Sequence, residues 1–248
     1  MIVSLILSLG VLATQLTQID YRYHSILVLG FLAYGLSSWA LFDDLKGVEW
    51  FTTLILPAIY PVSVSLFYFL LPERFLSRIF VLVIFGVGMY ALMLTENIFS
   101  VAAIRTIQLL RAAHAVGFLI TLVTAFFLYY TILSLRLPFW ANSLLVFGAS
   151  VPLLIQALWS VELTEKISKK NLMYGVFLAL AVGELALVLS FWPVTLEVGS
   201  LFLVSMLYVA LGISQQHFLE RMFRKTLYEY LAVGVVVLIT FLFVTKWG

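Results

Sequence analysis

The stretch TENIFSVAAIRTIQLLRAAHAVGF, residues 95–118, decides how this chain is arranged. The chain around it is dominated by apolar residues, whereas this stretch carries Glu96, Arg105, Arg111 and His114. Such a segment can cross a membrane, lie on its surface, or enter it and return to the same side. The choice sets the number of membrane elements and the side on which the chain begins.

The composition of the whole chain indicates a membrane protein. Of its 248 residues, 64% are hydrophobic and 10% are charged, whereas soluble domains have about 45–50% apolar and about 25% charged residues. A soluble protein of this size cannot hide so much apolar surface, because its outer shell needs polar side chains. The net charge of +2 is too small to indicate a nucleic-acid partner. The sequence contains no cysteine, which excludes disulfides and thiolate chemistry.

Nine apolar runs approach the roughly 20 residues that a membrane-spanning helix needs. Each run predicts a helix, because a backbone in hydrocarbon must satisfy its own hydrogen bonds. We therefore expect an all-α, polytopic transmembrane helix bundle that forms a single domain over residues 1–248. Its first run is expected to be retained as a span rather than removed as a signal peptide. The predicted spans are residues 2–19, 25–42, 51–71, 79–95, 115–135, 138–160, 171–192, 197–214 and 230–246.

Basic loops predict the orientation, since Lys and Arg mark the cytoplasmic side of a membrane. LTEKISKKN (163–171) and QQHFLERMFRKTLYEY (215–230) are rich in these residues, and the loop WPVTLE between them has none. The two basic loops are therefore expected in the cytoplasm and the C-terminus outside. This orientation of the second half does not depend on the stretch at residues 95–118.

Residues 96–114 leave two topologies open for the first half. As an interfacial or re-entrant segment they give nine spans, an N-terminus inside, and 9 Lys and Arg inside against 5 outside. If residues 98–113 cross as a tenth element, the N-terminus lies outside and the ratio becomes 11 to 3. Crossing would place Arg105 near mid-membrane at a cost of about 2.5–3.5 kcal/mol. We therefore predict nine spans and keep ten as the alternative.

Glu184 is the most prominent candidate for a functional residue, because it lies well inside the run 171–192. An ionisable group at this depth should face the interior of the bundle, either as a proton or cation site or as a hydrogen-bonded structural acid. The same run carries Gly175, Ala179 and Gly183 at intervals of four residues. This small-residue ridge allows another helix to pack closely.

Basic residues form two further candidate sites. Arg105, Arg111 and His114 could line a polar cavity together with Glu184 and bind an anionic group, or they could only reach the membrane interface. Residues 215–229 are expected to form an interfacial amphipathic helix. The basic face of that helix carries Arg221, Arg224 and Lys225. This face would attract anionic lipid headgroups, or would only fix the orientation of the chain in the membrane.

The sequence shows no catalytic or metal-binding pattern. It has no GxSxG, HExxH, P-loop or GxGxxG motif, and His24, His114 and His217 are scattered. We therefore expect no enzymatic activity, no metal and no other cofactor. The expected partners are the lipid bilayer and other membrane helices. For the function, we expect first a small transporter or permease-like protein. The alternative is a structural or accessory subunit that binds partner helices. The second alternative is a membrane enzyme that acts on a lipid-linked substrate.

The segment NIFSVAAIRTIQLLRAAHAVGFLITLVTAFFL (97–128) resembles a family of uncharacterised integral membrane proteins from candidate-phylum bacteria. The resemblance extends over most of the chain. It implies a polytopic membrane protein and favours a bacterial inner membrane as the location. It implies no activity, substrate or site residue.

Overall fold

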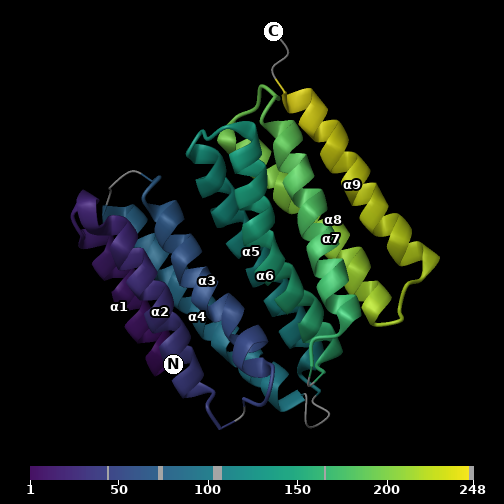
Figure 1. Ribbon diagram of the computed structural model, residues 1–248. Helices are drawn as coiled ribbons and strands as arrows, with labels where there is room; N and C mark the ends of the chain where they lie inside the picture. Colours follow the sequence, from purple (N-terminus) through teal and green to yellow (C-terminus); the bar gives the residue numbers. More distant parts are fainter. Residues whose placement is uncertain (44, 72–74, 103–107, 165, 246–248) are drawn as a thin grey trace. The chain divides into compact units, whose positions relative to one another are not determined.

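The computed structural model describes residues 1–43, 45–71, 75–102, 108–164 and 166–245. Within these ranges the chain forms nine α-helices and a short 3-10 helix and contains no β-strand, which confirms the predicted all-α class (Figure 1). The helices divide between two compact units. Unit 1 comprises Met1–Phe127 with Leu163–Lys166, and unit 2 comprises Leu128–Glu162 with Ile167–Gly248.

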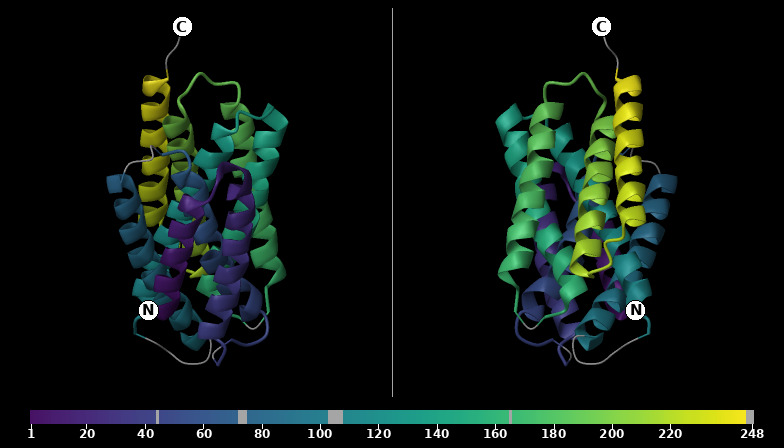
Figure 2. Two further views of the ribbon diagram at one scale, coloured as in Figure 1. Left: turned by 90° about the vertical axis from the view of Figure 1, so that its left-hand side faces the viewer. Right: turned by 90° about the vertical axis from the view of Figure 1, so that its right-hand side faces the viewer.

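Unit 1 is built around α3, in which most residues are buried. Consecutive helices from α1 to α4 run in opposite directions (Figures 1 and 2). Pro57 and Pro61 lie inside α3 and are themselves buried, so the helix continues through two residues that cannot donate a backbone hydrogen bond. The elements of unit 1 are α1 (Ile2–Leu16), the 3-10 helix (Ile19–Tyr21), α2 (Arg22–Ala40), α3 (Glu49–Tyr68), α4 (Phe75–Ala102) and the first part of α5 (Leu110–Ser134).

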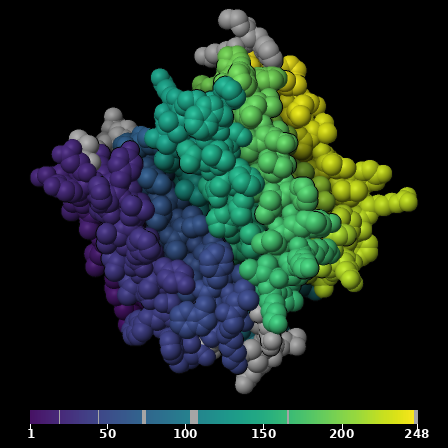
Figure 3. All heavy atoms as spheres, in the orientation of Figure 1, coloured from purple at the N-terminus to yellow at the C-terminus, as the bar shows by residue number. Residues whose placement is uncertain are grey.

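Unit 2 is built around α6, whose buried side chains include the whole stretch 153–160. Its closest helix packing is between α6 and α7. α9 lies beside α8 and has very few buried residues, so its yellow side chains form part of the surface in Figure 3. The elements of unit 2 are the rest of α5, α6 (Phe139–Glu162), α7 (Lys169–Leu189), α8 (Leu196–Phe218) and α9 (Arg224–Val244).

The small-residue ridge of α7 lies against α6. A Cβ atom added to Gly175 would stand 2.8 Å from Ile155 Cγ1, and one added to Gly183 would stand 3.0 Å from Phe147 Cβ. The hydroxyl of Ser143 donates a hydrogen bond of 2.8 Å to the Gly183 carbonyl. The glycines are therefore needed because the two backbones approach closely.

Asn171 of α7 ties the same two helices together by hydrogen bonds. Its side chain is fully buried. In the amide orientation that satisfies both of its atoms, the oxygen accepts from Trp159 N at 2.7 Å and the nitrogen donates to Ile155 O at 3.3 Å. The amide therefore joins two backbone groups that are one turn apart in α6.

Seven helices of the described chain are long and apolar enough to cross a membrane, namely α3 to α9. This is fewer than the nine spans predicted. All nine predicted runs contain a helix, but α1 has 15 residues and is about 22 Å long at 1.5 Å per residue, which is shorter than the hydrocarbon core of a bilayer. α2 has 19 residues but includes Arg22, His24 and several serines, which lower its apolar character.

The predicted interfacial or re-entrant segment 96–114 is divided between two long helices in the structure. Residues 96–102 continue α4 beyond the predicted end at residue 95, and residues 110–114 begin α5. The polar residues Thr95, Glu96 and Asn97 stopped the predicted span early. They do not stop the helix, since the bonding of its backbone does not depend on apolar side chains.

The predicted amphipathic helix 215–229 is also divided in the structure. α8 ends at Phe218 and α9 begins at Arg224. Glu220 adopts a left-handed conformation with φ of 54°, and Arg221 N donates to Gln216 O at 3.0 Å. This is the hydrogen-bond pattern that terminates many helices, and it interrupts the periodic apolar stripe in its middle.

Candidate functional sites

Glu96 is a fully buried carboxyl group within a helix long enough to span a membrane. It lies on α4, six residues before the helix ends at Ala102. It lies one residue beyond the predicted span 79–95 and is not among the candidate residues predicted from the sequence. An ionisable residue at such a position is costly to bury, and it is therefore a candidate for a functional role.

The environment of Glu96 in unit 1 brings together both halves of the stretch 95–118. A Cβ atom added to Gly117 of α5 would stand 3.3 Å from the ring of Phe99 and 3.4 Å from Cγ2 of Thr95, both on α4. The rings of Phe99 and His114 lie 5.5 Å apart at an angle of 30°. The end of α4 and the start of α5 therefore pack through Gly117, with half-buried His114 beside Phe99.

Other polar side chains are buried in unit 1. The hydroxyl groups of Thr95, Thr121 and Thr124 donate to carbonyls of their own helices at 2.7–2.9 Å, so their polarity is satisfied locally. Further buried groups form no hydrogen bond within the described part of the chain. They are the amide of Gln15 and the hydroxyls of Ser37, Thr53, Ser65 and Ser100.

The described residues among those predicted to line one polar cavity lie in different surroundings. Arg105 lies outside the described residues, and Arg111 is exposed on α5. Glu184 belongs to unit 2 and is exposed on α7, on the face opposite the ridge of Gly175, Ala179 and Gly183. Glu184 is therefore exposed on unit 2, whereas its depth in the run 171–192 predicted that it would face the interior.

Glu184 belongs to an apolar stripe on the exposed face of α7. Met173, Phe177, Leu180 and Glu184 are spaced as i, i+4, i+7 and i+11, and we call them the outer stripe. The three apolar members are 53%, 63% and 45% exposed. Glu184 comes 15 residues after the first residue of α7, about 22 Å along the helix at 1.5 Å per residue. This spacing matches the contact seam of two packed helices.

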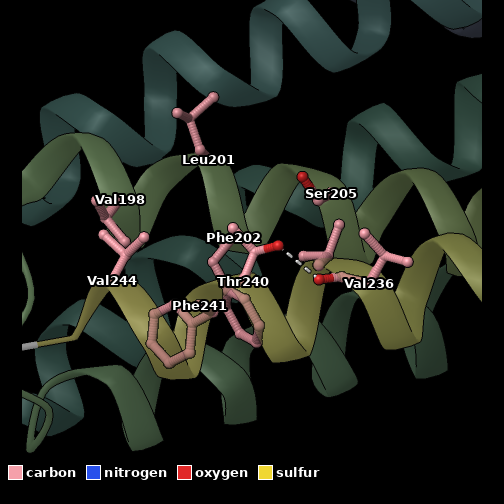
Figure 4. Close-up of a pocket in the computed structure, with 9 residues that line it drawn as sticks. Val198, Leu201, Phe202, Ser205, Val236, Thr240, Phe241 and Val244 are labelled. Atoms are coloured by element: carbon pink, nitrogen blue, oxygen red, sulfur yellow. Dashed lines mark hydrogen bonds between the residues drawn. The ribbon is translucent and has the colours of Figure 1, made fainter.

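A groove on unit 2 between α8 and α9 has a volume of about 300 Å³ and is lined mainly by apolar side chains (Figure 4). Phe202 and Phe241 meet in it, with ring centroids 4.3 Å apart. The hydroxyl of Thr240 donates to Val236 O of its own helix at 2.8 Å, as the dashed line in Figure 4 marks. The groove therefore suits an apolar chain better than a polar solute.

The basic residues of the predicted lipid-headgroup site are exposed in the structure. Arg221 lies in the connection between α8 and α9, and Arg224 and Lys225 form the start of α9. Among the described residues there is no group of three or more His, Asp or Glu side chains that could hold a metal ion.

The observations define an all-α, apolar-rich protein whose seven long apolar helices are consistent with a membrane protein. The family model described as "Protein of unknown function (DUF5656)" matches residues 2–244, and the chain belongs to this family. This confirms the expectation of an uncharacterised family that covers the chain. No curated protein and no solved structure matches it.

Proposed function

We propose that this chain is a non-enzymatic integral membrane protein that acts as a structural or accessory subunit, and that it associates with a partner helix through the outer stripe of α7. The observation that carries the proposal is the exposure of Glu184 on an apolar face of a helix long enough to span a membrane. A charged side chain facing hydrocarbon costs about 2.5–3.5 kcal/mol. A helix that covers the stripe and hydrogen-bonds the carboxyl group removes this cost.

The partner helix that we propose is α7 of a second copy of the chain. A two-fold symmetric contact brings the same stripe of both copies together. The Glu184 side chains of the two copies then face each other and can form hydrogen bonds across the contact. The ridge on the opposite face of α7 is already occupied by α6, so the outer stripe is the surface of α7 that remains for association.

Disulfide cross-linking in membranes tests this association, because the chain has no cysteine of its own. Leu180→Cys should give an oxidised dimer, since Leu180 lies one turn from Glu184 on the outer stripe. Adding Glu184→Leu should reduce the dimer strongly, and Glu184→Gln should retain it because an amide still forms hydrogen bonds. Leu238→Cys, on the exposed surface of α9, is the control. Equal cross-linking from both positions, or none from Leu180→Cys, would contradict the proposal.

The proposed location is the cell membrane, which in bacteria is the inner membrane, with the C-terminus outside. Lys169 and Lys170 begin α7, and residues 190–195 after α7 contain no Lys or Arg. This asymmetry favours a cytoplasmic start of α7 and an outer end. The same alternation favours a cytoplasmic start of α9.

Transport is the second candidate function, and the burial of Glu96 favours it. Buried carboxyl groups in membrane helices serve as proton or cation sites in many transporters. The site would then lie in unit 1 around Glu96 and His114 rather than at Glu184. We rank transport second because the described groove of Figure 4 is apolar and Glu184 is exposed.

A further inference from the structure

Five exposed basic side chains gather at one end of unit 2. Two of them begin α7, and three lie in or directly after the connection from α8 to α9, which returns to the same end of the unit (Figure 1). We call this set the basic end. It consists of Lys169, Lys170, Arg221, Arg224 and Lys225.

Aromatic contacts hold the two parts of the basic end together. The ammonium group of Lys170 lies 4.4 Å from the centroid of the Phe218 ring, the last residue of α8. The ring of Tyr174, one turn into α7, lies 5.3 Å from Phe218 and 5.9 Å from His217. The start of α7 is therefore packed against the segment that leads into Arg221 and Arg224.

The described carboxylates at this end are fewer than the cations. No acidic residue lies in the first turn of α7 or of α9, although the positive end of a helix dipole favours an anion there. Glu162 accepts a hydrogen bond of 2.9 Å from Ser168. Glu220 and Glu229 are the other described carboxylates of unit 2 near the basic end, and both are exposed.

Exposed apolar side chains are interleaved with the cations. Met222 is 39% exposed and Phe223 is 68% exposed, between Arg221 and Arg224, and Tyr228 is 67% exposed one turn further on. A loop in water gains nothing from exposing these groups. At a membrane interface they can enter the acyl region while the neighbouring basic groups stay at the headgroups.

We propose that the basic end binds the phosphate headgroup of an anionic phospholipid in the adjoining leaflet. Arg221 and Arg224 would pair with phosphate oxygens, which the guanidinium group matches in geometry. Lys169, Lys170 and Lys225 add positive potential, and Met222 and Phe223 contact the acyl chains. The proposal rests on the proposed membrane location and does not depend on association through α7.

Lipid binding to the purified, detergent-solubilised chain tests the proposal with dioleoylphosphatidylglycerol and dioleoylphosphatidylcholine as probes. In native mass spectrometry the unmodified protein should retain more phosphatidylglycerol than phosphatidylcholine. Phosphatidylglycerol should also raise its thermal unfolding temperature more than phosphatidylcholine does. The variant Arg221→Gln/Arg224→Gln/Lys225→Gln should lose both differences. High salt should weaken them in the unmodified protein.

A charge-matched control separates this site from general electrostatic attraction. The variant Lys46→Gln/Arg136→Gln removes two exposed cations elsewhere and should keep the preference for phosphatidylglycerol, whereas its charge-matched counterpart Arg221→Gln/Arg224→Gln should lose it. Equal loss in both variants, no loss in Arg221→Gln/Arg224→Gln, or full reproduction of the stabilisation by inorganic phosphate would overturn the proposal. Failure of the membrane location would appear differently, as a monomer that purifies without detergent.

Discussion

Glu96 and Glu184 both lie on helices long enough to span a membrane, but their environments are opposite. Glu96 is enclosed in unit 1, and Glu184 is exposed on unit 2. Glu96 exposes no surface to the surroundings of the chain. The free-energy cost of exposing Glu184 to hydrocarbon has to be offset by a group outside unit 2. This difference is why we assign association to Glu184 and structure, or secondarily transport, to Glu96.

Chemical modification of Glu96 distinguishes these two roles. With the protein in lipid vesicles, a water-soluble carbodiimide and an amine should modify exposed Glu220 readily and Glu96 much more slowly. The rate at a buried group falls about tenfold for each 1.4 kcal/mol of free energy needed to open the structure. Mass spectrometry of the two peptides measures both rates. Modification of Glu96 as fast as Glu220 would show access for water and support transport instead.

The sequence identified ionisable residues at membrane depth but could not assign the direction in which they point. Glu184 was predicted to face the interior, since that is the usual position of a membrane carboxylate, and its exposure follows from the packing of the opposite face against α6. Glu96 was assigned to the interfacial or re-entrant segment 96–114, because Thr95, Glu96 and Asn97 together end the apolar run. Asn171 was not selected, because a single polar residue near a predicted span end carries no pattern that distinguishes it.

Helices as elements were largely predictable, and their ends were less so. Every predicted run contains a helix, because the requirement for internal backbone hydrogen bonding follows from apolar composition alone. Neither of the segments predicted at 96–114 and 215–229 is one separate helix in the described residues. In the first, the helices continue through polar residues. In the second, a left-handed residue at Glu220 ends α8 within an apparently continuous periodic pattern.

The packing of α6 against α7 makes a prediction at the scale of elements. Gly183→Ala should reduce the free energy of unfolding by about 1–3 kcal/mol, the usual cost of overpacking, because the new Cβ meets Phe147 Cβ at 3.0 Å and Ser143 O at 3.2 Å. Gly148→Ala on α6 is the control, since nothing lies within 4 Å of its added Cβ. Unfolding in one detergent, followed by circular dichroism, compares the two. Equal stability of both variants would show that the ridge is not tightly packed.

At the scale of the whole molecule, composition alone predicted the class. The 64% share of hydrophobic residues indicated a membrane bundle, and the structure gives nine helices in the described residues, seven of them long and apolar enough to span. Family membership over residues 2–244 agrees with the predicted uncharacterised family. The division into two compact units had no counterpart in the sequence, because one boundary lies inside α5, between Phe127 and Leu128, where the predicted apolar run 115–135 is continuous. The single domain, the orientation and the partners remain predictions.

The most direct measurement of the central claim, that the apolar helices cross a membrane, is single-cysteine labelling at the two ends of α7. Thr164→Cys lies in the connection before α7 and Pro193→Cys in the connection after it, and both positions are exposed. A membrane-impermeant maleimide added to spheroplasts should label position 193, and it should label position 164 only after the membrane is permeabilised. Labelling of both positions from outside at the same rate would contradict a membrane-spanning α7 and the account built on it.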